Sequence, residues 1–376
     1  MHVAVITEYN PFHLGHEYQL LKLRTAFPDA CITAIMGGIF SQRGEPYIAS
    51  PYTRAAAAVK CGADLVVELP FPYSCAPAGI FARAGVEIAA KIGADMLAFG
   101  SECGDTAELF ATLSRLESDE MTEAVRAEGE EIGKTRAYAN AYKKLYGKDA
   151  PSLPNDILAI EYLRAIKHGG YDIKPYTVKR VGDFKSGEGG FASATSIRNA
   201  FEKCDYDALS GKVPLAAEKI YLNEPFGTDI EKVASAVLLN LLNVGDDIAF
   251  SGGGLLNHLK NASQTVKSIA ELRKNAATKR YTDAEISRAI IYSLFSVKKA
   301  DLEKEVQYTR LFAANSRGRE VLNFVRDIEV VTKPSALHAM SDTARAQFER
   351  TFLAERAFAL CLDGEYEFLK QSPRIE

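Results

Sequence analysis

The chain has 376 residues, a formal net charge of −4, and 47% hydrophobic and 25% charged residues, a globular balance that supports a sizeable core. This composition excludes a chain that is basic throughout, although a local basic face remains compatible with binding nucleic acid. The length indicates two or three domains, or one catalytic domain with a large appendage.

The first residues, MHVAVITEYNPFH, lack the basic start and the long apolar stretch of a signal peptide. No segment reaches about 18 uninterrupted apolar residues, so we expect a cytoplasmic protein without a membrane span. The six cysteines include no CxxC pair, which excludes zinc-ribbon spacing. Several of them lie in apolar runs, where buried, reduced thiols are expected.

The first half of the chain alternates strands with helices. Apolar, β-branched runs predict the strands, and helical periodicity marks the segments between them. The sequence predicts strands over 2–7, 31–38, 63–70 and 94–102, helices from residue 17 and over 53–61, 79–92 and 107–146, and a last strand within 171–184. This order predicts an α/β fold with a parallel sheet, helices on both faces, and ligand-binding loops at the carboxyl edge over 8–16, 37–44 and 99–102.

The pattern changes after about residue 205. Four later segments, 233–243, 263–276, 283–297 and 316–328, have the periodicity of amphipathic helices. We therefore predict a Rossmann-like parallel-sheet domain over residues 1–205, followed by a mostly helical domain over residues 206–376.

The first candidate site is His13-Leu14-Gly15-His16, between the first strand and the following helix. Gly15 lets a nucleotide approach the backbone closely, and the free amides and positive dipole of a helix start attract phosphate. Two imidazoles there can donate to phosphate oxygens as charge builds during attack on the α-phosphate, and Asn10 can add a polar contact. A bare HxGH match also fits ordinary polar loop residues, but its place directly after the first strand favours a nucleotide site.

A second candidate segment is SATSIR, over residues 193–198, at a helix start. Ser193 or Thr195 can cap that helix, and the hydroxyls and amides there can hold the β- and γ-phosphates of a nucleotide. Arg198 can counter the phosphate charge. Alone, the segment also fits an ordinary helix cap; the upstream HxGH motif favours the phosphate interpretation.

Longer strings carry a more specific resemblance. In order, the chain contains EYNPFHLGH, SQRGEP, GADLVVELPF, FGSE, PNDILAIEY, KRVGDF, SATSIR, GLLNHL, TKRYT and SRGREVL. Together they resemble the bacterial tRNA(Met) cytidine acetate ligase family, within the HxGH nucleotidyltransferase superfamily. The resemblance runs from about residue 3 to residue 335.

The resemblance implies a defined reaction. Members of that family activate acetate with ATP to give acetyl-adenylate and pyrophosphate, and Mg²⁺ is expected because ATP phosphates normally carry it. The acetyl group then passes to the exocyclic amine of the wobble cytidine of elongator tRNA(Met), which gives N4-acetylcytidine. His13 and His16 would be the catalytic residues, and no protein-held metal is expected.

The resemblance also implies a set of ATP contacts. The first loop and the helix after it supply most of them, and single positions in FGSE, PNDIL, KRVG and SATSIR supply the rest. Named by residue, they are Ile6, Thr7, Glu8, Tyr9, Asn10, Pro11, Phe12, His13, Leu14, Gly15, His16, Glu17, Tyr18, Gln19, Gly100, Asn155, Arg180, Ser193, Thr195 and Arg198.

Two further pairs are weaker candidates. Gln42 and Arg43 follow the second strand and can position acetate or cytidine, or can simply be solvated loop residues. Asp64 and Glu68 lie in or beside the third strand, where buried carboxylates require partners, and neither is assigned as a base.

The helical half contains basic residues interspersed with Tyr281 and Tyr308 that can contact phosphates and bases. The same pattern is typical of solvated helix faces. The family resemblance implies tRNA binding by Lys279, Arg280, Arg288, Arg317 and Arg319, with Arg310 and Arg326 as further candidates. The chain departs from the family's usual residues at His258, at Glu285 and between Asp183 and Ala194.

Two alternatives stay open. The first is a small-molecule adenylyltransferase of the same superfamily, against which the long helical half and its basic residues argue. The second is a non-catalytic RNA-binding protein on this fold, against which the intact HxGH and SATSIR motifs argue. Turnover of ATP distinguishes the enzymes from the non-catalytic RNA-binding protein. Dependence of product formation on tRNA distinguishes the tRNA ligase from the small-molecule adenylyltransferase.

Overall fold

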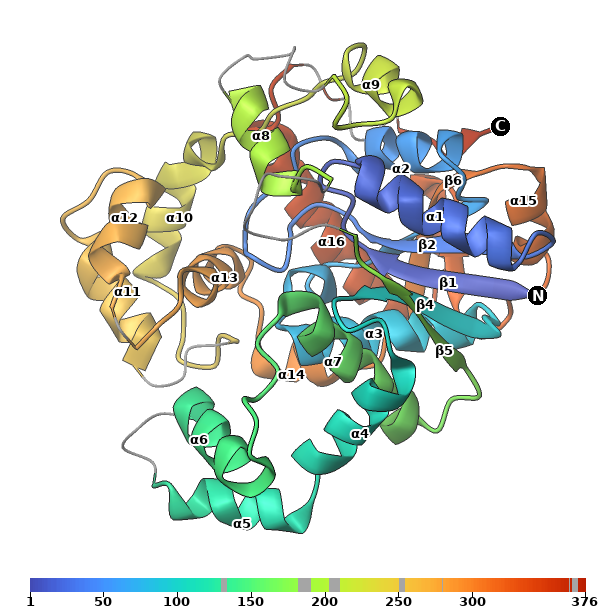
Figure 1. The fold of residues 1–376 in the computed structure, drawn as a ribbon. Helices are drawn as coiled ribbons and strands as arrows, with labels where there is room; N and C mark the ends of the chain where they lie inside the picture. The colour runs from blue at the N-terminus through green and yellow to red at the C-terminus, as the bar shows by residue number, and fades with distance from the viewer. Residues whose placement is uncertain are drawn as a thin grey trace.

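The computed structural model describes residues 1–129, 134–181, 191–202, 210–249, 254–278, 280–364, 366 and 371–376. Within these residues the centre is an eight-stranded sheet in the order β5-β4-β1-β2-β3-β6-β7, with β8 beside β6. Helices cover both faces of the sheet, and a group of further helices lies beyond one end of its strands (Figure 1).

Five strands form the parallel part of the sheet, as the sequence predicts. They are β1 (His2–Thr7), β2 (Cys31–Gly37), β3 (Leu65–Leu69), β4 (Met96–Ser101) and β5 (Lys174–Lys179). The strands β1, β2 and β3 are buried along their whole length, which is why they read as continuous apolar runs rather than as alternating patterns. The α/β prediction is confirmed.

Helices pack on the two faces as separate apolar layers. On one face α1 (Leu14–Ala26) and α2 (Pro51–Lys60) share a core with β1 and β2, and on the other α3 (Ala78–Lys91) packs with α7 (Pro154–Gly169). Helix α2 begins at Pro51, because Ser50 accepts from the Thr53 amide and proline is favoured at a first helical position. Between β4 and α7 the chain forms α4 (Thr106–Leu116), α5 (Asp119–Ala127) and α6 (Lys134–Tyr146).

Three strands come from the last third of the chain, so the expectation that the last strand lies within 171–184 is wrong. Strand β6 (Tyr308–Ala314) runs antiparallel to β3, and β7 (Glu329–Val331) and β8 (Arg374–Ile375) both pair with β6. A buried arginine, Arg310, interrupts the apolar run of β6, so the sequence of β6 does not show the continuous apolar pattern of the other buried strands. The division of the chain at residue 205 stays a prediction about folding units, since the sheet takes strands from both sides of it.

The rest of the second half is helical, as predicted. It comprises α8 (Ala194–Glu202), α9 (Leu215–Tyr221), α10 (Ala234–Leu241), α11 (Leu255–Ser263), α12 (Ile269–Ala276), α13 (Asp283–Leu294), α14 (Lys299–Glu303), α15 (Ser316–Leu322) and α16 (Asp342–Cys361), with 3-10 turns η4 (Ile230–Val233) and η6 (Pro334–Ala339). A further 3-10 turn, η1 (Tyr73–Cys75), follows β3 in the first half of the chain.

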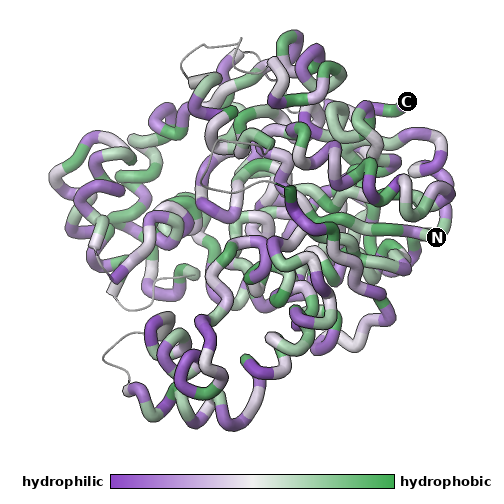
Figure 2. Tube along the Cα trace, viewed as in Figure 1, coloured by the Kyte–Doolittle hydropathy of each residue, from purple (hydrophilic) through white to green (hydrophobic). Residues whose placement is uncertain are grey.

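The helices α10 to α13 share one apolar core with the loops that follow β2 and β3. Phe40 and Phe71 from those loops pack with Ile290 and Phe295 of the helical layer. Figure 2 shows polar residues along the outer turns of these helices and apolar residues where they face the body. The helical layer is therefore joined to the carboxyl edge of the sheet through buried side chains. None of the described helices has the length and apolar character that a membrane crossing requires.

Candidate active site at the carboxyl edge of the sheet

The two histidines of the HxGH motif lie together at the start of α1. His13 is the N-cap of the helix and His16 lies in its first turn, and their rings stack with centroids 3.7 Å apart. The almost fully buried rings of Tyr9 and Phe12 contact His16, with centroid distances of 4.8 and 5.6 Å. The helix begins at Leu14 rather than at the expected residue 17, because His13 itself supplies the cap.

Backbone amides fix the tautomer of both rings. The Gly15 amide donates to Nδ1 of His13 at 3.0 Å, and the His13 amide donates to Nδ1 of His16 at 3.2 Å. A ring nitrogen that accepts a hydrogen bond carries a lone pair, so a neutral ring places its proton on Nε2. Both imidazoles therefore present an Nε2–H donor, which is the group that a phosphate oxygen requires.

Both histidines are held neutral. Burial, together with the positive charges of Arg180 and Arg198, lowers the pKa of His13 to about 4. Burial also places the pKa of His16 well below its usual range, with contributions from His13 and Arg180. The same two arginines that disfavour an imidazolium favour an anion, so the site is arranged to receive negative charge.

Gly15 is required by the position of the His13 ring. A Cβ at Gly15 would lie 2.9 Å from Cε1 and 3.1 Å from Nδ1 of His13. Any side chain at this position would therefore move the ring or remove the hydrogen bond that sets its tautomer. This close approach is the structural reason for a glycine between the two histidines.

The structure brings the SATSIR segment to the HxGH loop. Arg198, on α8, donates to the backbone carbonyl of Asn10 at 2.8 Å and to the Thr195 hydroxyl at 3.1 Å. Ser193 accepts from the Ser196 amide at 3.1 Å, as a helix cap does. Motifs that are nearly two hundred residues apart in the chain thus form one site.

A third group of predicted residues meets where β4 and β5 end. Arg180 donates to the Asn155 side chain at 3.4 Å, and Gly100 lies against the Arg180 stem. Glu102 accepts from the Asn155 side chain at 2.6 Å and from the Asp156 amide at 2.8 Å, while Asp156 accepts from the Glu102 amide at 2.9 Å. Glu102 is not among the residues predicted from the sequence, although it lies in the FGSE string and its carboxylate holds the Asn155 side chain.

Arg54 is a positioning residue that the sequence analysis missed. It is fully buried on α2 and donates to the carbonyls of Glu8 at 2.6 Å, Ala49 at 3.1 Å and Gly37 at 2.9 Å, and also to Gly38. These carbonyls belong to the loops after β1 and β2, so one guanidinium fixes both loops relative to each other. The signal in the sequence is an arginine that opens an otherwise apolar alanine helix.

The loop after β2 is joined to the first loop and to the helical layer. The Glu8 carboxylate accepts from the Gln42 amide at 2.9 Å and from the Tyr47 hydroxyl at 3.2 Å. Arg288 of α13 donates to the Gln42 carbonyl at 2.6 Å. Gln42 thus lies against the first loop, whereas Arg43 is exposed.

The other residues predicted to contact ATP lie in the part of the chain around the HxGH motif. They lie in β1, in the loop between β1 and α1, or in the first two turns of α1. They are Ile6, Thr7, Pro11, Leu14, Glu17, Tyr18 and Gln19.

The predicted RNA contacts do not form one surface. Arg280 is exposed and lies over the Tyr281 ring at 5.6 Å, and Lys279 lies outside the described residues. Arg288 is buried beneath the Gln42 loop, so it does not lie on an exposed helix face as expected. Glu285, where the family often has a basic residue, forms a capping box with the N-cap of α13.

Two of the other basic residues lie at the opposite end of the sheet. Strand β6 runs antiparallel to β3, so the carboxyl end of β6 lies beside the amino ends of the parallel strands. Arg317 and Arg319 lie at that end, in helix α15 directly after β6. Arg326 is exposed shortly after α15. The proposal of Arg310 as an RNA contact is wrong, because it is buried and bridges the Glu68 and Glu355 carboxylates.

The two candidate carboxylates of β3 have partners, as burial requires. Asp64 accepts from Arg24 at 2.6 Å, from the Asn315 side chain at 2.9 Å and from the Ile32 amide at 2.8 Å. Glu68 pairs with Arg310. Neither group is available as a base.

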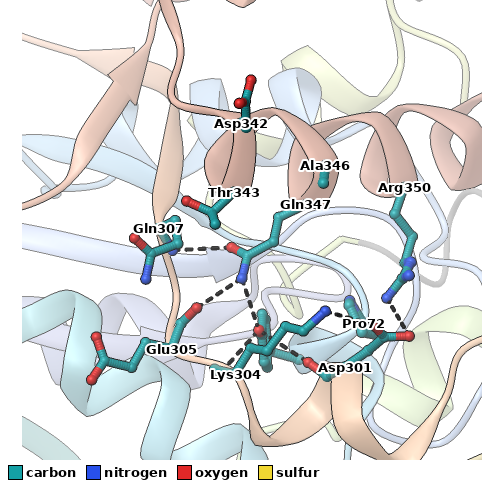
Figure 3. A pocket seen from close by; sticks show the side chains of 11 residues that line it. Pro72, Asp301, Lys304, Glu305, Gln307, Asp342, Thr343, Ala346, Gln347 and Arg350 are labelled. Carbon is teal, nitrogen blue, oxygen red and sulfur yellow. Dashed lines mark hydrogen bonds and ion pairs between the residues drawn. The ribbon is translucent and has the colours of Figure 1, made fainter.

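A cleft of about 440 Å³ opens between η1, α14 and α16 (Figure 3). Its side chains pair with one another: Arg350 binds Asp301 at 2.7 Å, and Gln347 donates to the Glu305 carbonyl and accepts from the Gln307 amide. No residue predicted for the ATP site lines it. In the described part of the chain, no group of three or more His, Cys, Asp or Glu residues has an arrangement that would hold a metal ion.

Comparison with known proteins identifies the family. A family model described as HIGH Nucleotidyl Transferase matches residues 1–372. The tRNA(Met) cytidine acetate ligase of Caldicellulosiruptor saccharolyticus is 30% identical, over 98% of this chain and 96% of that protein. The enzymes of that name from Caldanaerobacter subterraneus and Bacillus subtilis are 32% and 31% identical, over 95% and 91% of this chain and 94% and 88% of their own lengths.

A solved structure has the same fold. Thermotoga maritima TmcAL bound with alpha-thio ATP superposes with a TM-score of 0.89 at 26% identity, covering 100% of this chain and 99% of that one. The match extends over both the sheet and the helical layer. The chain belongs to the HIGH nucleotidyltransferase family and, within it, to the family of the tRNA(Met) cytidine acetate ligases.

Proposed function

We propose that this chain is an ATP-dependent acetate ligase that acetylates a cytidine of tRNA(Met). The observation that carries the proposal is the pair of Nε2–H donors of His13 and His16 at the start of α1, next to Arg180 and Arg198. The named relatives act, by their names, on acetate and on a cytidine of tRNA(Met), and the Thermotoga structure holds an ATP analogue.

In the first step an acetate oxygen attacks the α-phosphorus of ATP. A new P–O bond forms, the bond to the β-phosphate oxygen breaks, and pyrophosphate leaves with that electron pair, which gives acetyl-adenylate. Negative charge grows on the α-phosphate oxygens and on the leaving group, where the two Nε2–H groups donate and the two arginines balance the charge. A neutral imidazole still carries one N–H, here on Nε2, so the lowered pKa values leave each ring a donor for this role.

In the second step the exocyclic amine of cytidine attacks the acetyl carbon. A C–N bond forms, the C–O bond to AMP breaks, and AMP leaves with the electron pair, while the amine releases one proton. The product is N4-acetylcytidine. We place this cytidine at the wobble position of elongator tRNA(Met), and we place the reaction in the cytoplasm because its substrate is tRNA.

We expect Mg²⁺ to accompany ATP on its phosphates rather than in a protein site. ATP phosphates normally carry Mg²⁺, and the step above is written with imidazole and guanidinium groups alone. We retain residues 1–205 as the catalytic part and 206–376 as an RNA-binding part, with Arg280, Arg319 and Arg326 as exposed basic candidates in the latter.

The test uses the full chain with ATP, Mg²⁺, labelled acetate and an unmodified tRNA(Met) transcript. The expected result is label in acetylcytidine after digestion, with a loss of about 10²–10³-fold in His16→Ala. Acetate-dependent pyrophosphate release without label in RNA would discard tRNA as the acceptor and favour a small-molecule adenylyltransferase. Absence of both products would overturn the enzymatic proposal.

A further inference from the structure

The insertion between β4 and α7 starts and ends at the ATP site. The chain leaves the site at Glu102, directly after β4, and returns to it at Asn155, in the first turn of α7. Glu102 and Asp156 exchange hydrogen bonds with each other's backbone, and Glu102 also holds the Asn155 side chain. The helices α4, α5 and α6 are therefore tied at both ends to the carboxyl edge of the sheet.

Helices α5 and α6 form a hairpin with a core of its own. Met121, Ala141 and Tyr142 are buried between the two helices. The Tyr146 hydroxyl donates to the Arg115 carbonyl at 3.1 Å and lies 3.1 Å from the Ser118 hydroxyl, which ties α6 to the end of α4. Figure 1 shows the hairpin projecting from the body of the molecule beyond α4 and α7.

The two helices of this hairpin carry opposite charge. Segment 134–148 contains Lys and Arg residues at positions 134, 136, 143, 144 and 148 and no Asp or Glu, in a chain whose net charge is −4. Segment 119–127 contains three acidic residues and one arginine, Arg126. Among the described residues, Lys143 pairs with Asp149 and Lys148 pairs with Glu108 of α4, and Asn140 of α6 donates to the Glu128 carboxylate, at the end of α5, at 2.9 Å.

The basic residues of α6 form one stripe. Arg136, Asn140, Lys143 and Lys144 are spaced i, i+4, i+7 and i+8, which places them on one face of a helix. All four are exposed, and this face lies away from the buried Tyr142. Lys143 binds Asp149 at 2.9 Å, but both groups are well exposed, and such a surface pair is weak enough to be exchanged for a phosphate.

We propose that this α6 stripe, defined as Arg136, Asn140, Lys143 and Lys144, binds the phosphate backbone of the tRNA whose cytidine reacts with the acetyl-adenylate at the ATP site. The inference rests on the proposed function and adds a surface outside the helical second half. Lysine and arginine contacts to phosphate position an RNA without reading its sequence.

The experiment compares two arginines of the same hairpin. Arg136→Ala removes an exposed cation from the stripe, whereas the matched control Arg126→Ala removes an exposed cation from acidic α5. A triple variant, Arg136→Ala with Lys143→Ala and Lys144→Ala, enlarges the effect without adding a helix breaker. The readouts are the KM for tRNA(Met), the Kd of a fluorescent tRNA(Met) transcript at several salt concentrations, and acetate-dependent pyrophosphate exchange without RNA.

We expect the triple variant to raise the KM and the Kd about tenfold or more. The slope of log Kd against log salt concentration is expected to fall by about two to three. Arg136→Ala shows a smaller rise, Arg126→Ala shows none, and pyrophosphate exchange is unchanged in all three. An unchanged Kd in the triple variant, or an equal loss in Arg126→Ala, overturns the inference. If the wild type binds tRNA but does not acetylate it, the proposed function fails while the Kd still decides the role of the stripe.

Discussion

Two arginines are buried in this molecule in opposite surroundings. Arg54 is surrounded by backbone carbonyls of the loops at the ATP site, whereas Arg310 bridges two carboxylates between β3 and α16. Burial lowers the pKa of Arg54 to about 10, whereas Glu68 and Glu355 raise the pKa of Arg310 well above its usual range. The first arginine fixes loops that carry the chemistry, and the second cross-links elements that carry none of it.

The largest effect is expected from Arg310→Leu. Its removal leaves Glu68 and Glu355 buried without a counter-charge, which costs about 3–5 kcal/mol in the free energy of unfolding. Chemical denaturation measures this loss directly. Acetate-dependent pyrophosphate exchange by the folded variant at low temperature is expected to stay close to that of the wild type, because no Arg310 contact reaches the site. An unaltered unfolding midpoint contradicts this account of the cluster.

Arg54→Lys tests the other side of the comparison. A lysine cannot reach carbonyls of both loops at once, so we expect a loss of about 1–3 kcal/mol in stability together with a fall in exchange activity of about tenfold or more. Arg310→Lys is the matched control, for which stability falls and activity per folded molecule is retained. If Arg54→Lys lost stability alone, Arg54 would be an ordinary core residue.

The HxGH and SATSIR motifs and the two buried arginines differ in how far the sequence predicts their surroundings. The parallel sheet, the HxGH loop and the SATSIR helix follow from apolar periodicity and local motifs, and the residues named for them meet at one edge. Strand β6, Arg54 and Arg310 do not follow, because each depends on a partner far along the chain: β6 on β3, Arg54 on three loop segments, Arg310 on Glu68 and Glu355. A basic residue in a sequence does not show whether its partner is a carboxylate or an RNA phosphate.

Gly15→Ala changes the site without touching either arginine. The added Cβ displaces the His13 ring, so we expect exchange activity to fall about tenfold while the unfolding midpoint changes little. Gly79→Ala, in the first turn of α3, is the control, because the nearest atom to its Cβ is the end of the flexible Glu161 side chain at 3.2 Å. Equal activity of the two variants would show that the ring position does not matter for the reaction.

The smallest effect concerns pH and stability. The pKa of His13 is lowered to about 4 in the folded chain, and that of His16 is also lowered, so between pH 4 and 6.5 the unfolded chain binds more protons at these sites than the folded chain. Their contribution to stability is therefore fully present above pH 6.5 and is lost as the pH falls toward 4. We expect denaturation midpoints to fall from pH 7.5 to pH 5, and to fall less in the His13→Asn, His16→Asn double variant. Part of the decline remains in that variant, because burial also lowers the pKa of His2. A decline of the same size in wild type and double variant would show that the imidazoles are not held neutral by the fold.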